Sequence, residues 1–139
     1  MSAAAPAYAE AVAASRPGRT VRVLHVFPGF GMGGVQNRIA DVANRLPEGL
    51  DHVCIPLDGQ TDARDRLRPE TPWRFAPAPE ARGVTGLPAA RATIRRLAPD
   101  VVCTYNWGAI EWALACGLLR GPGHLHFESG FGPEEADEP

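Results

Sequence analysis

The feature that most constrains this chain is the alternation of short apolar runs with segments of helical periodicity. The runs are rich in β-branched and aromatic side chains, which is typical of strands. They cover residues 21–27, 52–57, 73–75, 101–105 and 124–127. Strands that alternate with helices form a parallel sheet with helices on both of its faces. The sequence therefore predicts an α/β, Rossmann-like fold, and 139 residues are enough for one such domain.

The segments between the strands carry apolar residues three and four positions apart, as one face of a helix requires. Helices are expected at residues 35–46, 87–97 and 110–119, with a helical turn at 62–67. The segment 110–119 is almost wholly apolar, so we expect it to be packed on both sides. A disordered, Ala-rich lead-in is expected over residues 1–20, the folded domain over 21–133, and an acidic tail over 134–139.

A glycine-rich turn joins the first strand to the first helix. Glycines let the backbone approach a ligand closely, and a helix N-terminus offers N–H groups and a partial positive charge. The turn therefore predicts an anionic small molecule as ligand. Gly29, Gly31 and Gly34 fit the pattern G-x-G-x-x-G, and Asp58 ends the second strand, where a dinucleotide fold has its ribose-binding acid. A P-loop is excluded, because the chain has no Lys to serve it.

Charge and cysteine usage exclude several other classes. The net charge is −2, with no concentrated basic stripe, so nucleic acid is not expected as a partner. The arginines of segment 87–97 suggest no more than weak membrane contact, because a solvated helix face explains them. Cys54, Cys103 and Cys116 match no metal-binding spacing and are expected to be buried, reduced thiols in a cytoplasmic protein. Arginine without lysine is typical of GC-rich bacterial coding.

Three stretches together are similar to one enzyme family. They read VRVLHVFPGFGMGGVQNRIADVANRL over residues 21–46, LAPDVVCTYNWGAIEWALA over 97–115, and HLHFESGFGPEEA over 124–136. In this order they resemble the N-terminal domain of family 4 glycosyltransferases, which have the two-domain GT-B fold. Gln36 stands where the family usually has Glu. The resemblance covers roughly residues 21–136 and implies an incomplete acceptor-side domain of such an enzyme.

The resemblance also implies roles for particular residues. Gly31, Gly33 and Gly34 would face the phosphates of a nucleotide-sugar donor. Asn106 and Trp107, at the end of a strand, would line the acceptor pocket.

The last strand and the loop after it would supply the chemistry. His126 and Glu128 are the candidates for the base and its orienter, and Ser129 and Gly130 would shape the loop. His124 and His126 alternate along the strand and so face the same side, and His126 is preferred because it lies nearer the strand end.

Structural interpretations of several of these residues remain open. His25 in the middle of a strand is expected to be a core histidine. Trp107 and Trp112 are more often core residues than substrate platforms, and Asn106 could simply form an Asx-turn. Glu128 could cap the turn that follows it.

The substrates implied by the resemblance are a nucleotide sugar and an acceptor glycan or lipid-linked sugar, with no cofactor and no metal. A C-terminal donor domain or a partner chain would have to supply the rest of the active site, so we expect the 139-residue chain alone to be inactive. Two alternatives remain. One is an NAD-binding Rossmann domain, and the other is a non-catalytic module that pairs with a partner chain.

Overall fold

The computed structural model describes residues 20–46, 48–118 and 122–128 of the chain. Within them, five parallel strands form one sheet in the order β3-β2-β1-β4-β5. The strands are β1 (Val21–Phe27), β2 (Leu50–Pro56), β3 (Trp73–Phe75), β4 (Val101–Tyr105) and β5 (Gly123–Phe127). The predicted α/β, Rossmann-like fold is confirmed. The Ala-rich lead-in up to residue 19, Ser129, Gly130 and the acidic tail lie outside the described residues.

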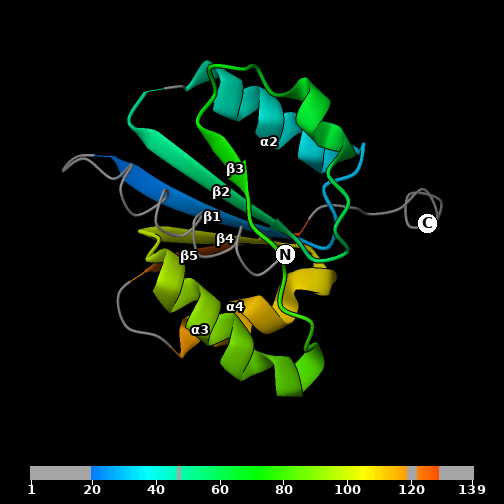
Figure 1. Ribbon diagram of the computed structural model, residues 1–139, viewed down its shortest axis with the longest axis vertical. Coiled ribbons are helices and arrows are strands. Elements are labelled where there is room, and N and C mark those ends of the chain that lie inside the picture. Colours follow the sequence, from blue (N-terminus) through cyan, green and yellow to red (C-terminus); the bar gives the residue numbers. More distant parts are fainter. Residues whose placement is uncertain (1–19, 47, 119–121, 129–139) are drawn as a thin grey trace, which may run out of the picture.

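Helices cover both faces of the sheet (Figure 1). The helices are α2 (Gly34–Arg45), α3 (Leu87–Leu97) and α4 (Ile110–Gly117), with short 3₁₀ turns η1 (Asp62–Arg66), η2 (Gly83–Gly86) and η3 (Trp107–Ala109). Helix α2 lies on one face, and α3 and α4 lie on the other. This follows from the strand order, because the chain moves outward from β1 to β3 and then crosses back to β4. The direction of travel reverses between β1 and β4, which is the position where ligands bind in open α/β sheets.

Alternate residues of β1 are buried in two separate cores. Leu24 and Val26 pack in the core that α3 and α4 cover, together with Ile94 and Trp112. Phe27 faces the other side and packs with residues such as Phe30 and Tyr105 under α2. Burial on both faces is the reason that the strand reads as a nearly continuous apolar run.

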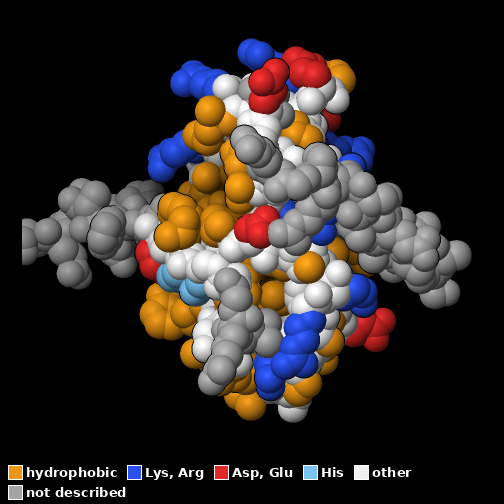
Figure 2. Space-filling model, turned by 90° about the vertical axis from the view of Figure 1, so that its left-hand side faces the viewer, with side chains coloured by type: hydrophobic (Ala, Val, Ile, Leu, Met, Phe, Trp, Pro, Cys, Tyr) orange, Lys and Arg blue, Asp and Glu red, His pale blue; other side chains and the backbone are white. Residues whose placement is uncertain are grey.

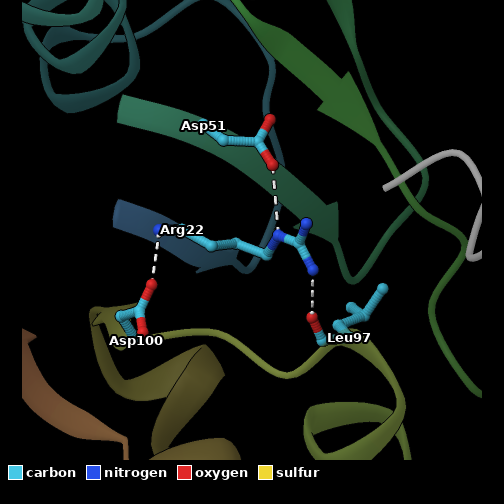
Figure 3. Close-up of polar contacts among 4 residues, drawn as sticks. All are labelled: Arg22, Asp51, Leu97 and Asp100. Carbon is cyan, nitrogen blue, oxygen red and sulfur yellow. Dashed lines mark hydrogen bonds and ion pairs between the residues drawn. The ribbon is translucent and has the colours of Figure 1, made fainter. Parts of the chain in front are cut away.

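A buried arginine joins neighbouring elements at the end of the sheet where the strands begin (Figure 3). The side chain of Arg22 is 2% exposed, its Nε lies 3.1 Å from Asp51 Oδ2, and one terminal N–H donates to Leu97 O at 2.9 Å. Leu97 ends α3, so the guanidinium also meets the negative end of a helix dipole. Asp100 joins the cluster by accepting from Arg22 N at 2.8 Å. This network ties β1, β2 and α3 together at the end of the sheet opposite the strand carboxyl ends.

The expectation that segment 110–119 is packed on both sides is wrong. Helix α4 ends at Gly117, and it buries one face only, with Trp112 and Cys116 against the sheet. Leu114 is 59% exposed and Leu118 is 63% exposed. An apolar helix need not be buried all round, because a helix on the outside of a sheet contacts the sheet with one side only. Within the described residues, no helix is long and apolar enough to cross a membrane.

The expectation of buried thiols is confirmed. Cys54, Cys103 and Cys116 are free and buried. Burial raises the pKa of the Cys103 thiol to about 11, and it also raises the pKa of Cys54. These thiols are therefore protonated and shielded, in keeping with a packing role.

Candidate functional site

The carboxyl ends of the five strands lie at one edge of the sheet because all the strands run in the same direction. The glycine turn follows β1, Asp58 lies just beyond β2, Asn106 follows β4 and Glu128 follows β5. The predicted site residues within the described chain therefore share this edge, at both sides of the switch point between β1 and β4.

The first half of the glycine turn is filled by the protein's own side chains. A Cβ on Gly29 would lie 2.3 Å from Asp58 Oδ2, and one on Gly31 would lie 2.7 Å from Gln60 Oε1. Gln36 folds back over the turn and donates from Nε2 to Gly29 O at 2.9 Å. Glycine is needed at these positions because neighbouring side chains occupy the space that a Cβ would take. The carboxylate against Gly29 would also repel a phosphate at that position.

The second half of the turn leaves free space at Gly34. Gly33 is the N-cap of α2, no side chain caps this helix by a hydrogen bond, and its first turn has no acidic residue. A Cβ on Gly34 would meet nothing within 4 Å, whereas one on Gly33 would lie 2.6 Å from Gln36 Oε1. Of the glycines predicted to face a phosphate, Gly34 is therefore the one with free space beside it, at the positive end of a helix.

Asn106 adopts a backbone conformation that residues other than glycine rarely adopt. Its φ is 60° and its ψ is 175°, a region used almost only by glycine. Its N–H donates to Phe127 O at 2.8 Å, which fastens the end of β4 beside Glu128, and its carbonyl accepts from Ala109 N at 3.1 Å. Strain of this kind persists where the surrounding structure enforces it, and it is concentrated at functional sites.

The exposed indole of Trp107 follows this strained residue. The side chain is 74% exposed, whereas Trp112 is 1% exposed, so the core interpretation holds for Trp112 and is wrong for Trp107. The next residue, Gly108, packs against Pro28, because a Cβ there would lie 2.7 Å from Pro28 Cγ. The loop after β4 therefore lies directly against the glycine turn.

His126 and Glu128 form a hydrogen-bonded line with a buried threonine. Thr104 Oγ1 lies 2.7 Å from His126 Nδ1, and His126 Nε2 lies 2.6 Å from Glu128 Oε1. Both ring nitrogens of His126 are engaged, so the ring has none left for a substrate hydroxyl. The side chain of Glu128 is 50% exposed. Of these side chains, Glu128 is therefore the one with a half-exposed carboxylate, and His126 holds that carboxylate through a hydrogen bond.

His124 lies on the same side of β5 as His126, as the alternation predicted, and it contacts the same threonine. Its Nε2 lies 2.9 Å from Thr104 Oγ1, and its pKa is lowered by partial burial and by the neighbouring His126. The hydroxyl has one proton, so it donates to one histidine and accepts from the other. Figure 2 shows histidine side chains at the surface beside a group of hydrophobic side chains, in keeping with the exposure of His124 and Leu125.

A second group of hydrogen-bonded polar side chains lies in the core. The sequence predicted burial for only one of them, His25. Tyr105 Oη lies 2.8 Å from His25 Nδ1, and His25 Nε2 lies 2.9 Å from His52 Nδ1. Burial, with a smaller contribution from His52, lowers the pKa of His25 to about 3. Burial also lowers the pKa of His52 against the opposing effect of Asp51. The core interpretation of His25 is confirmed, and the ring is neutral at physiological pH.

No His, Cys, Asp and Glu side chains gather in a group of three that could hold a metal ion within the part of the chain that the structure describes. In comparisons with known proteins, neither a protein-family model nor a curated protein matches this chain.

Proposed function

We propose that this chain is the acceptor-side domain of a glycosyltransferase, which moves a sugar from a nucleotide sugar to an acceptor hydroxyl. The observation that carries the proposal is the strained Asn106 at the sheet edge where ligands bind in this class of fold. A glycine at that position would relieve the strain, so the side chain has a use that offsets a cost of about 1–3 kcal/mol. The resemblance to family 4 glycosyltransferases, which implies an acceptor pocket lined by this residue, supports the proposal.

Trp107 supports a sugar as the acceptor. A pyranose ring has an apolar face of C–H groups and a rim of hydroxyls, so it packs against an aromatic ring while polar neighbours bind its rim. The Trp107 indole is exposed next to Asn106, a residue whose side-chain amide has both N–H groups and an acceptor oxygen.

Glu128 supports proton transfer from the acceptor. In the proposed step the acceptor oxygen forms a bond to the anomeric carbon, its proton passes to the Glu128 carboxylate, and the nucleoside diphosphate leaves. His126 holds one carboxylate oxygen at 2.6 Å and is itself fixed by Thr104. A carboxylate that is oriented and partly exposed meets the geometric requirement for a general base.

The open start of α2 supports contact with the donor. The diphosphate of a nucleotide sugar is anionic, and the N–H groups beside Gly34 and the helix dipole favour an anion. The donor's remaining contacts would come from a C-terminal domain or a partner chain, which must also close over the acceptor before transfer.

Tryptophan fluorescence tests the acceptor site on the chain as it exists. Mono- and oligosaccharides are titrated one at a time, and we expect a saturable change in emission with at least one of them. Trp107→Ala should abolish the change, and Val84→Ala, which removes another exposed apolar side chain, should leave it intact. Either the absence of a saturable change with every saccharide, or an equal change in Trp107→Ala, would contradict the proposal.

A further inference from the structure

A cavity of about 440 Å³ lies at the carboxyl ends of β2 and β3, away from Asn106 and Trp107. Its volume is within the range of small-molecule sites. Leu57 and Phe75 contribute to its apolar walls, together with the prolines of the loop after β3. Asp58 lies at its lining as well, next to the glycine turn. The cavity is used by none of the steps proposed for sugar transfer.

The walls of this cavity are held in place without a ligand. Pro77 and Pro79 have fixed φ angles, which stiffen the loop. Arg82 donates to Leu57 O at 2.6 Å and also to Pro79 O, so one guanidinium joins the end of β2 to the loop after β3. A slot that is already formed lowers the entropy lost on binding. Proline and phenylalanine rings on apolar walls offer surfaces against which a planar aromatic group can pack.

The charged residues in the lining of the cavity are Asp58, Glu80 and Arg82, and of these Asp58 lies beside the glycine turn. Its Oδ1 accepts from Gln60 N at 2.8 Å, and its backbone N–H donates to Pro28 O at 3.0 Å. These two bonds fix the side chain against Gly29, the first glycine of the G-x-G-x-x-G pattern. An anchored carboxylate with remaining lone pairs is suited to accept hydrogen bonds from two adjacent hydroxyls. In dinucleotide-binding folds an acid at this position holds the ribose.

We propose that this cavity binds a nucleoside, with the base between the proline loop and the end of β2 and the ribose 2′- and 3′-hydroxyls on Asp58. The ligand class follows from three features that lie together: an apolar preformed slot, a fixed carboxylate at its rim, and a glycine turn that lets that carboxylate approach. The site is separate from the proposed acceptor site. It would give the domain a nucleotide contact of its own, on the acceptor side of the enzyme.

The test is calorimetric titration of the 139-residue chain with adenosine, guanosine, cytidine and uridine, followed by the 2′-deoxy form of whichever binds best. We expect saturable binding of at least one ribonucleoside and weaker binding of its 2′-deoxy form. Asp58→Asn keeps the acceptor oxygen for Gln60 N but removes the charge, and it should weaken binding by about tenfold or more. It should also reduce the preference for ribose.

Asp62→Asn is the matched control, because Asp62 is exposed in η1 and does not line the cavity. It should bind as the wild type does. Ala78→Phe fills the slot and should abolish binding, with the fold checked by circular dichroism. The inference is overturned if no ribonucleoside binds at millimolar concentration, or if Asp58→Asn binds as tightly as the wild type. Trp107→Ala should leave nucleoside binding unchanged, so failure of the sugar proposal is distinguishable from failure of this one.

Discussion

The neutral histidine in the core makes the stability of this protein depend on pH in a way that can be worked out in advance. His25 has a pKa of about 3 in the folded state, against 6.5 in an unfolded chain. Between these values the unfolded state binds more protons than the folded state does. The stability from this residue is therefore complete above pH 6.5 and is lost as the pH falls towards 3.

The size of the effect follows from the same two values. At pH 5 the unfolded chain gains about 2 kcal/mol from protonation of His25, and the full gap is about 5 kcal/mol once both states are protonated. The pKa of His52 is lowered too, so its contribution has the same sign. With an m-value of about 2 kcal/mol/M, the urea midpoint should fall by about 1 M between pH 8 and pH 5 because of His25 alone.

The assay is urea unfolding at pH 8 and pH 5 for the wild type, His25→Gln and His124→Gln. His25→Gln should lose about 2 kcal/mol less than the wild type over this interval, whatever its stability at pH 8. His124→Gln is the comparison variant, because His124 is exposed and its pKa is lowered only through partial burial and the neighbouring His126, so it should remove less of the pH dependence than His25→Gln does. Equal losses in the wild type and His25→Gln would refute the reasoning.

Three further substitutions test the packing around the site. Arg22→Met should lower the free energy of unfolding by about 3–5 kcal/mol in urea titrations, because it leaves Asp51 buried without its ion pair, and adding Asp51→Leu should restore much of the loss. Gly108→Ala should lower Tm, because a Cβ at this position has no room beside Pro28. Gly117→Ala is the comparison and should raise Tm or leave it unchanged, because a Cβ there would meet nothing within 4 Å. Equal changes in Tm would contradict the close contact between the loop after β4 and the glycine turn. Asn106→Gly should raise the stability by about 1–3 kcal/mol while weakening saccharide binding, and a loss of stability would argue against backbone strain.

The parts of the fold that depend on local pattern could be predicted from the sequence. The predicted bounds of the strand at 101–105 and of the helix at 87–97 agree with the structure. Hydrophobic periodicity and the residues that end a helix or strand act over only a few positions, so a local pattern is enough to locate these elements. The second strand begins at Leu50, earlier than expected, because Asp51 is polar and hides the strand in the sequence pattern. That carboxylate is buried through its ion pair with Arg22, 29 residues away. A local pattern contains no information on such a partner.

In the candidate site, too, local features could be predicted from the sequence, whereas contacts between distant residues could not. The position of Asn106 at a strand end could be predicted, but its positive φ arises from the contacts that surround it. The sequence predicted that His124 and His126 lie on one side of the last strand, whereas Thr104, which is within hydrogen-bonding distance of both rings, belongs to the neighbouring strand. The glycine pattern indicated an open cradle, and the side chains that fill its first half come from residues as distant as Asp58 and Gln60.

The most direct test of the proposed function is a map of saccharide binding on the backbone amides. The ¹H–¹⁵N spectrum of the labelled chain is recorded during titration with the saccharide that alters Trp107 emission, and separately with NAD⁺. We expect the saccharide to shift the amides of Asn106, Trp107 and Glu128 together, in a saturable manner. Shifts confined to other parts of the chain, or shifts at these three amides with NAD⁺ in place of the saccharide, would contradict an acceptor site at the carboxyl end of β4.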